Sequence, residues 1–328
     1  MKQFFTFLLI LMLATFFTSN AFAQDEPKKR SYEEYGIVAE AGGVLIGKGS
    51  LIVEPALQYT HIESQRLDIT GFTVLPTLVV GLIQIQKIRR DILTPSVTFK
   101  YGILDPLEFD LKIPYSLRKD DYNIGSGANT ENKNVSDSGI GDVEGSFLWQ
   151  LATEKGARPD IIANLRVKSD TGEDPFGLAT ETIQGIPVPE DELPTGSGFW
   201  AVEPSFTFVY TTDPAVVFCN LGYFWHIERS IDNVGKVDPS DSFNFSVGSS
   251  FALNNKFILS TAYEQKWFTE TSIDGAKQED TDINIGSIIF GGSYVTSDTS
   301  SINLSVSIGM TPDSPDTQLS LRYSLRVF

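Results

Sequence analysis

Hydrophobic and polar residues alternate strictly along residues 107–118, the segment LEFDLKIPYSLR. A period of two places one set of side chains on each face of a β-strand, whereas a helix would scatter both sets around its axis. The segment is longer than the usual strand of about 5–6 residues in soluble proteins and long enough for the roughly 9–11 residues of a tilted membrane-spanning strand. Its charged residues would be costly inside a soluble core, but not on the inner wall of a water-filled barrel. Taken alone, the segment also fits an edge strand of a soluble sheet.

The same alternation returns along the chain and predicts an all-β fold, an antiparallel transmembrane β-barrel of the outer-membrane type with about 12 strands. In residues 301–310, for example, every second residue is apolar and the residues between are Ser, Asn or Gly. A soluble sandwich would not carry so many small and charged residues on one face of each strand. The predicted strands are residues 51–65, 82–103, 106–118, 139–153, 159–169, 198–211, 215–229, 241–253, 256–270, 281–295, 301–310 and 316–328.

The predicted connections alternate between short turns and long polar loops, as they do in outer-membrane barrels, whose short turns are periplasmic. The short turns are residues 104–105, 154–158, 212–214, 254–255 and 296–300. The long loops are residues 119–138, 170–197, 230–240 and 271–280. An even number of strands places both ends of the barrel in the periplasm. Residues 66–81 remain open between an apolar excursion of the first loop and part of an extra strand pair.

The N-terminal residues predict export and divide the chain into three parts. Residues 1–23 have a positive start at Lys2, a hydrophobic core and a small-x-small site at Ala21–Ala23, as in a secretory signal peptide. After residue 23 there is no apolar stretch of about 18 residues, so a membrane protein with this sequence must be a barrel. We expect residues 24–50 to form a periplasmic lead-in or a plug, with a short helix over residues 31–41, and residues 51–328 to form the barrel.

Charge and motif content exclude several functional classes. Removing the signal peptide takes away one lysine and no acid, so the net charge moves from −17 to −18, which argues against a nucleic-acid partner. The single cysteine excludes an intramolecular disulfide. There are two histidines, His61 and His226, and no H-E-x-x-H motif, G-x-S-x-G motif or metal-spaced Cys/His cluster, so we expect no enzyme, cofactor or metal site. His61 falls on the lipid-facing phase near the outer rim, and this keeps a lipid-active enzyme as an alternative.

Charged residues on the polar phase of the strands are the candidate lumen-lining site. If they line an open pore, they set its ion or solute preference, and Asp142 and Glu144 would do so at little cost in stability. If they pair inside a closed lumen, they form a structural core instead. The acidic loops at residues 169–177 and 188–196 lack EF-hand spacing, and we expect them to be solvated. The candidates are Glu108, Asp110, Lys112, Arg118, Asp142, Glu144, Arg166, Lys168, Glu203, Glu264, Lys266, Arg322 and Arg326.

Aromatic residues gather near the predicted strand ends, as the interface girdles of membrane barrels do. Phe328 ends the chain, as an aromatic residue does in many barrels, but it is one residue out of phase with the apolar set of residues 321–327. We interpret it as an assembly signal, which implies the barrel-assembly machinery as a partner.

Several sequence blocks resemble one known family. The blocks GGVLIGKG (42–49), EPALQY (54–59), GFTVLP (71–76), RRDILTPSVTFKYGILDPLEFDLKIPY (89–115), GIGDVEGSFLWQL (139–151) and PTGSGFWAVEPSF (194–206) are similar to the outer-membrane proteins of the meta-pathway of phenol degradation. The resemblance implies a barrel in the bacterial outer membrane and uptake of small, aromatic or otherwise hydrophobic molecules. It supplies no catalytic motif. We therefore expect a channel or facilitator for small organic solutes, with outer-membrane lipid and the solute as partners, and keep a closed barrel with a structural or surface-interaction role as the alternative.

Overall fold

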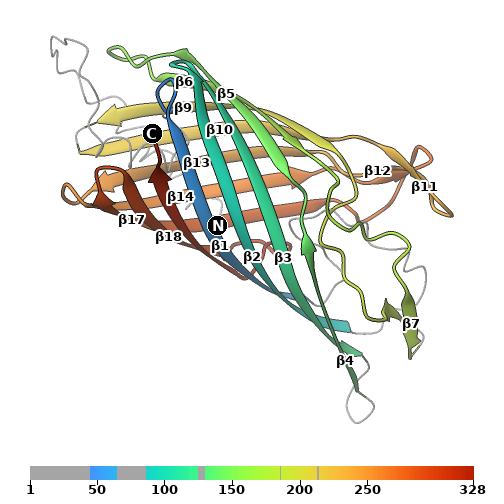
Figure 1. Ribbon diagram of the computed structural model, residues 1–328. Coiled ribbons are helices and arrows are strands. Elements are labelled where there is room, and N and C mark those ends of the chain that lie inside the picture. Colours follow the sequence, from blue (N-terminus) through green and yellow to red (C-terminus); the bar gives the residue numbers. More distant parts are fainter. Residues whose placement is uncertain (1–44, 65–85, 125–129, 185, 213) are drawn as a thin grey trace, which may run out of the picture. The chain divides into compact units, whose positions relative to one another are not determined.

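Twelve antiparallel strands form a closed barrel in the computed structural model, which describes residues 45–64, 86–124, 130–184, 186–212 and 214–328. Each wall strand pairs with its neighbours in the chain, and the first strand pairs with the last, which closes the wall (Figure 1). The wall consists of β1 (Leu51–Ser64), β2 (Gln86–Leu104), β3 (Leu107–Ile124), β4 (Glu131–Ile140) together with β5 (Glu144–Ala152), β6 (Asp160–Lys168), β9 (Ala201–Thr212), β10 (Ala215–His226), β13 (Ser242–Ala252), β14 (Phe257–Phe268), β17 (Ile283–Ser297), β18 (Ser300–Gly309) and β19 (Thr317–Arg326).

The alternation of the sequence sets which side chains face outward. On β18, Leu304 lies opposite Gly292 and Leu321, and its side chain is exposed on the outside of the wall. The neighbouring Ser305 points the other way, opposite Gly291. The same holds around the barrel, where the exposed large side chains are the apolar set and the alternate polar set is largely buried. An outward apolar belt around a polar interior is the arrangement expected for a barrel in lipid.

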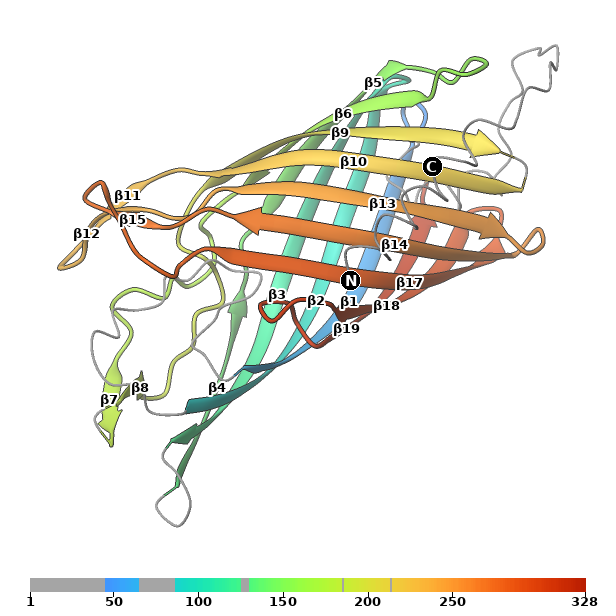
Figure 2. The same ribbon diagram turned by 180° about the vertical axis from the view of Figure 1, so that it is seen from behind.

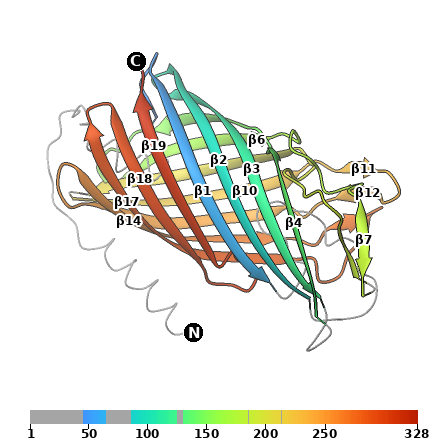
Figure 3. The same ribbon diagram turned by 60° about the horizontal axis from the view of Figure 1, so that its bottom comes forward.

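The predicted loop at residues 119–138 is wrong. Residues 119–124 continue β3, residues 131–138 belong to β4, and the two segments pair as a hairpin, with Lys119 opposite Ser136. Its outward residues, such as Lys119 and Asp121, are polar, whereas Tyr122, Ile124 and Val135 are buried on the other face. The outward apolar set that identified the other strands is therefore absent. The hairpin and the outer end of β2 extend past most of the other strands, as Figure 3 shows.

The predicted strand at residues 139–153 is interrupted. Its first part pairs with β3 up to Ile140 and its second part resumes at Glu144. Between them Gly141 N still donates to the Pro114 carbonyl of β3, and the regular pairing is lost at residues 141–143. β4 pairs only with β3 among the described strands, whereas β5 pairs with both β3 and β6. The wall therefore has a break at residues 141–143.

The two ends of the barrel differ as the sequence predicts. Short turns lie at the end that carries residue 45 and Phe328, which we take as the periplasmic end, and the longer connections lie at the other. The long connections contain two small sheets, seen from behind in Figure 2. One is formed by β7 (Thr180–Ile183) and β8 (Ile186–Pro189), and the other by β11 (Arg229–Ile231), β12 (Gly235–Asp238), β15 (Ser272–Ile273) and β16 (Ala276–Lys277).

Several predictions lie outside the described residues. These are the signal peptide at residues 1–23, the helix at residues 31–41 with most of the lead-in, and the ambiguous segment at residues 66–81. None of the described residues forms a helix long and apolar enough to cross a membrane.

Candidate functional site

A ladder of alternating charges runs along the inner face of four neighbouring strands. Lys112 Nζ on β3 lies 3.6 Å from Glu144 Oε1 on β5. Glu144 Oε2 accepts a 3.0 Å hydrogen bond from Arg166 Nη1 on β6, and Arg166 pairs in turn with Glu203 on β9. The inward phase places these four side chains on adjacent strands, which lie about 4.8 Å apart. Each charge thus finds its partner along the wall.

Glu203 extends the ladder past β10, which has a glycine where the hydrogen bond crosses it. The amide of Asn244 on β13 donates to Glu203 Oε1, although β10 lies between their strands. The residue of β10 between them is Gly222, where a Cβ would lie 3.1 Å from Glu203 Oε1. On the same strand, the Phe224 ring lies under the Arg166 guanidinium at 5.3 Å. At this end of the ladder, Gly222 leaves room for the hydrogen bond between Glu203 and Asn244, and the Phe224 ring packs against Arg166.

A second cluster lies toward the periplasmic end. Arg322 Nη1 on β19 lies 3.9 Å from Glu54 Oε1 on β1, and Ser324 Oγ donates to the other oxygen of Glu54. Glu108 accepts a 2.7 Å hydrogen bond from the backbone N–H of Ile46, a buried residue that precedes β1. This hydrogen bond links Glu108 to the residues that precede β1.

Two more residues belong to this second cluster. The Lys100 ammonium interacts electrostatically with Glu54, with Glu108 and with the neighbouring Asp110. Lys100 was not among the predicted residues, although it shares the inward phase of Thr98 on β2.

A third cluster surrounds Asp120, near the outer end of β3. The Asp120 side chain is 0% exposed and binds both Arg90 on β2 and Arg118 on β3 through charged hydrogen bonds of 2.7–3.1 Å. The Tyr122 hydroxyl donates to the same carboxylate at 3.1 Å. The sequence prediction included Arg118 but missed Arg90 and Asp120. Asp120 lies in the segment that the sequence analysis interprets as a loop. Its inward position follows only if the alternation of β3 is continued past Arg118, which places Asp120 on the same face.

Asp142 lies in the wall break and holds the connection between β6 and β9. Its side chain is 1% exposed and accepts hydrogen bonds from Gly172 N at 3.1 Å, from Ser197 N at 2.9 Å and from Lys168 Nζ at 2.7 Å. The lysine also donates to Ser197 Oγ and to the Phe199 carbonyl oxygen. Asp142 and Lys168 are thus fully engaged with the connection at residues 169–200.

The same connection repairs the break in the wall. Thr171 Oγ1 donates to the Gly141 carbonyl and accepts from Val143 N, and Ser169 N donates to the Val143 carbonyl. Leu193, Thr195 and Ser197 are buried. The expectation that both acidic stretches of this connection are solvated is therefore wrong for much of it, because their backbone and small polar residues complete the hydrogen bonding of the wall.

Acidic side chains of this connection do not gather into a metal site. Among the described residues there is no group of three or more His, Cys, Asp or Glu side chains arranged to hold a metal ion. Partial burial, with the nearby carboxylates of Asp137, Glu192 and Asp174, raises the pKa of Glu173 above its ordinary value of 4.5. The carboxylates around Glu173 therefore repel one another.

The remaining predicted residues form no ion pair with the ladder, although Glu264 interacts electrostatically with Arg166. Glu264 Oε1 and Lys266 Nζ pair within β14 at 3.1 Å. Arg326 ends β19, opposite Ile52 of β1. His226 is buried at the end of β10, where its Nδ1 lies 2.7 Å from the Ser240 carbonyl oxygen.

The inner face of the other half of the wall carries small side chains. Register places these residues on the same phase as Asn244 and Glu264 on the strands from β13 to β18. They are Ser246, Gly248, Ser250, Ser260, Ala262, Ser287, Gly291, Ser293, Ser301, Asn303, Ser305 and Ser307. The same phase also carries Ile258, Ile285 and Ile289, and Ile258 packs with Val209 and Val216 in a buried apolar cluster. This half of the lining is therefore mainly small residues with a few isoleucines.

His61 lies on the outer face, as predicted. Its Nδ1 lies 2.7 Å from Asp91 Oδ1, and the Tyr59 hydroxyl donates to the same oxygen at 2.6 Å. The hydrogen-bond partner of the histidine ring is thus an acid on the neighbouring strand, and a serine does not hold that position.

The fold and the outward apolar belt define an outer-membrane β-barrel with a polar, ion-paired interior. The chain belongs to the family described as "Putative MetA-pathway of phenol degradation", whose model matches residues 41–327. This membership confirms the resemblance seen in the sequence blocks.

Among solved structures, the chain is similar to the COG4313 outer membrane channel from Pseudomonas putida F1, with a TM-score of 0.61, 14% sequence identity, and coverage of 87% of this chain and 97% of that one. At this identity the likeness supports the fold alone. The transport unit of the autotransporter AIDA-I from Escherichia coli matches with a TM-score of 0.47, 11% identity and 96% coverage of each chain. The toluene transporter TodX from P. putida matches with a TM-score of 0.43, 11% identity and 90% coverage of each chain.

Proposed function

We propose that the protein is an outer-membrane channel or facilitator for small organic solutes, hydrophobic and aromatic solutes included. The observation that carries the proposal is the direction of ion pairing inside the wall. Each ion pair described above for the interior joins residues on the same strand or on neighbouring strands, as Lys112, Glu144, Arg166 and Glu203 do. Direct pairs therefore run along the wall, and contact between more distant strands is limited to the electrostatic interaction of Arg166 with Glu264 and the Glu203–Asn244 hydrogen bond. This arrangement favours a path beside the charges over a core of ion pairs that spans the bore.

The composition of the interior supports a polar path with one charged side. Fixed charges beside a narrow aqueous path select among ions and solutes, and the strands from β13 to β18 offer mainly hydroxyl groups and glycines, with isoleucines at positions 258, 285 and 289. We assign this lining role to Lys112, Glu144, Arg166, Glu203, Glu264, Lys266 and Arg322. Asp142 and Lys168 instead hold the β6–β9 connection, and Arg118 belongs to the buried cluster around Asp120.

One comparison favours organic solutes and another favours a channel. The family description refers to phenol degradation, and the P. putida protein with the similar fold is described as an outer membrane channel. We propose no reaction for the chain, since His61 contacts Asp91 and Tyr59 without a serine nucleophile. Hydrolysis of phospholipid by the folded protein would contradict this part of the proposal.

Conductance in planar bilayers and swelling of liposomes test the channel directly. The folded protein should conduct ions and should admit phenol, benzoate and a neutral sugar of similar size at measurable and unequal rates. Folding is checked beforehand by the heat-dependent mobility of the barrel on a gel. A folded protein with neither conductance nor swelling would contradict the proposal.

That outcome would favour the second candidate, a closed barrel with a structural or surface-interaction role. One observation supports this candidate: the β3–β4 hairpin and the sheet formed by β11, β12, β15 and β16 build an ordered surface on the side of the long loops.

A further inference from the structure

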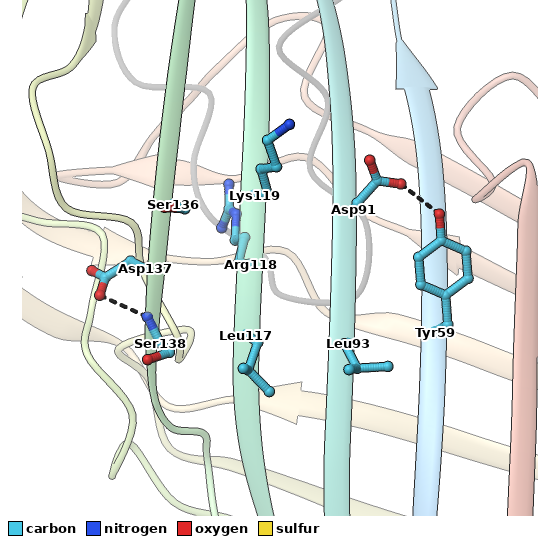
Figure 4. A pocket seen from close by; sticks show the side chains of 9 residues that line it. All are labelled: Tyr59, Asp91, Leu93, Leu117, Arg118, Lys119, Ser136, Asp137 and Ser138. Atoms are coloured by element: carbon cyan, nitrogen blue, oxygen red, sulfur yellow. Dashed lines mark hydrogen bonds between the residues drawn. The ribbon is translucent and has the colours of Figure 1, made fainter.

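The outer face of β1 to β4 carries a cavity of about 510 Å³. Tyr59, Leu93 and Leu117 lie at one end of its lining, and Asp91 and Lys119 lie at the other, with two serines of β4 at its side (Figure 4). The cavity thus has an apolar floor and a charged upper end. It lies outside the interior that the proposed channel uses.

The cavity lies at the upper boundary of the apolar belt. Along the outward phase of β3, exposed Tyr115 and Leu117 are followed by Lys119. On β2 the outward phase changes from Leu93 to Asp91 in the same direction. Because this end of the barrel carries the long loops, the boundary faces the outer leaflet. The headgroups of outer-leaflet lipids lie at this depth.

Two described cations of the outer wall lie at this height: Lys119 lines the cavity, and Arg89 is next to it beyond the lining. Among the side chains that the structure describes, Arg89 and Lys119 are the two lysine or arginine residues on the outward phase of the wall strands, and they are 51% and 53% exposed. Asp91 is paired with Lys119 across β2 and β3, and Arg89 with Asp121, so the two cations are diagonal neighbours on one face. Such neighbours are about 7–8 Å apart, within reach of long side chains. One phosphate group can contact both.

The nearby acids leave these cations available. The Asp91 carboxylate is bound by Tyr59 and His61. Arg89 Nη2 lies 3.9 Å from Glu63, and Lys119 Nζ lies 3.1 Å from Asp121. Exposed ion pairs of this kind contribute little to stability, whereas arginine binds phosphate through two parallel hydrogen bonds. A phosphate can therefore replace the acid partners at small cost.

We propose that this cavity binds a phosphorylated glycolipid of the outer leaflet. Arg89 and Lys119 hold its phosphate, Leu93 and Leu117 contact an acyl chain, and Ser136 and Ser138 offer hydrogen bonds to sugar hydroxyls. The complementarity has two parts, an anionic group at the height of the cations and a hydrocarbon chain at the height of the belt. A soluble anion would use only the first part.

Lipid retention tests the site. The full chain is folded into phosphatidylcholine vesicles that contain bisphosphorylated lipid A, extracted in mild detergent, and its bound lipid A is counted by native mass spectrometry. We expect the Arg89→Gln/Lys119→Gln double variant to retain at least tenfold less lipid A than the parent. The matched control is Lys236→Gln/Lys277→Gln, which removes two cations from the hairpins beyond the wall and should retain as much as the parent. Equal retention by both double variants would overturn the proposal.

Two further arms use the parent alone, so the test does not depend on folding of a variant. Lipid A without its phosphates should be retained at least tenfold less than the bisphosphorylated form, and equal retention of the two would overturn the proposal. Millimolar inorganic phosphate should leave the bound lipid in place. Displacement by inorganic phosphate would mean that a soluble anion suffices, and would also overturn it.

Discussion

Glu203 on β9 reaches Asn244 on β13 over Gly222 of the strand between them. Neighbouring strands commonly share hydrogen bonds between side chains, but here the bond passes over one strand, and a glycine makes this possible. The charged ladder consequently ends on an amide of the small-residue half of the wall. A side chain at position 222 would separate the two halves.

Substitution of Gly222 should therefore disturb the interior. A Cβ at this position would meet both Glu203 Oε1 and the Ser205 Cβ at 3.1 Å, and the larger Gly222→Val side chain would break the bond to Asn244. We expect a loss of about 1–3 kcal/mol in the free energy of unfolding, the usual cost of overpacking, and a smaller conductance. Urea unfolding in lipid vesicles measures the first quantity. Gly292→Ala is the control, because the nearest atoms there lie at an ordinary 3.8–3.9 Å.

The register of β18 can be tested with two adjacent residues. Leu304 is exposed on the lipid-facing side and Ser305 faces the interior. Leu304→Arg should cost roughly 2–4 kcal/mol in folding into vesicles, since a cation near the bilayer midplane is poorly solvated, and Ser305→Arg should cost much less. The yield of folded protein and the unfolding midpoint check this. Equal costs at both positions would contradict the observed phase.

Asp142 should be structural, in contrast to its predicted role in ion preference. Asp142→Asn leaves Lys168 buried without a counter-charge, and loss of one partner of a buried pair typically costs about 3–5 kcal/mol. We expect faster proteolysis of residues 170–199 and a lower unfolding midpoint. Adding Lys168→Met should recover part of the loss, because it removes the stranded charge. Asp298→Asn, on an exposed turn, is the matched control.

Ion preference should instead depend on the ladder. Arg166 lies between Glu144 and Glu203, so Arg166→Met leaves two carboxylates beside the path and should move the reversal potential toward cation preference. Glu144→Gln removes one negative charge and should move it the other way. Both are measured in planar bilayers under a salt gradient. Shifts of the same sign in both variants would show that these charges do not face the conducting path.

The β6–β9 connection should be held more firmly at acidic pH. The pKa of Glu173 is raised in the folded protein by partial burial and by the carboxylates of Asp137, Glu192 and Asp174. Its protonated form is therefore favoured by folding, and this stabilisation is present below 4.5 and lost as the pH rises through the raised pKa. Hydrogen exchange of residues 172–197, corrected for its intrinsic pH dependence, should slow on acidification. Glu173→Gln should slow exchange at neutral pH and remove most of this dependence.

Alternation predicts the barrel because one physical rule acts on every strand in lipid. Leu304 must face hydrocarbon and Ser305 must not, and the sequence shows this directly. The rule is weaker beyond the apolar belt, where the outward residues of β3 are polar, and so residues 119–124, which continue β3, were interpreted as a loop. Asp120, the centre of a buried cluster, was missed for the same reason.

The role of Asp142 could not be predicted, because its partners lie far along the chain. Ser197 is 55 residues away, and nothing in the local sequence indicates that its backbone N–H returns to Asp142. By contrast, Glu144 and Arg166 lie on consecutive predicted strands on the same polar phase, so strand order brings the two side chains close together. Sequence reasoning thus located the ladder but could not separate its members from residues that hold a connection.

The break at residues 141–143 constrains the order in which the wall can form. Each hairpin of the barrel can pair as soon as its second strand is available, because its partners are neighbours in the chain. The hydrogen bond from Val143 to Thr171 and those from Ser197 to Asp142 span 28 and 55 residues, so they must wait until the segment beyond β6 has been delivered. An assembly intermediate that ends at β6 would therefore carry an open seam beside β4, and the return of the β6–β9 connection is the step that closes it.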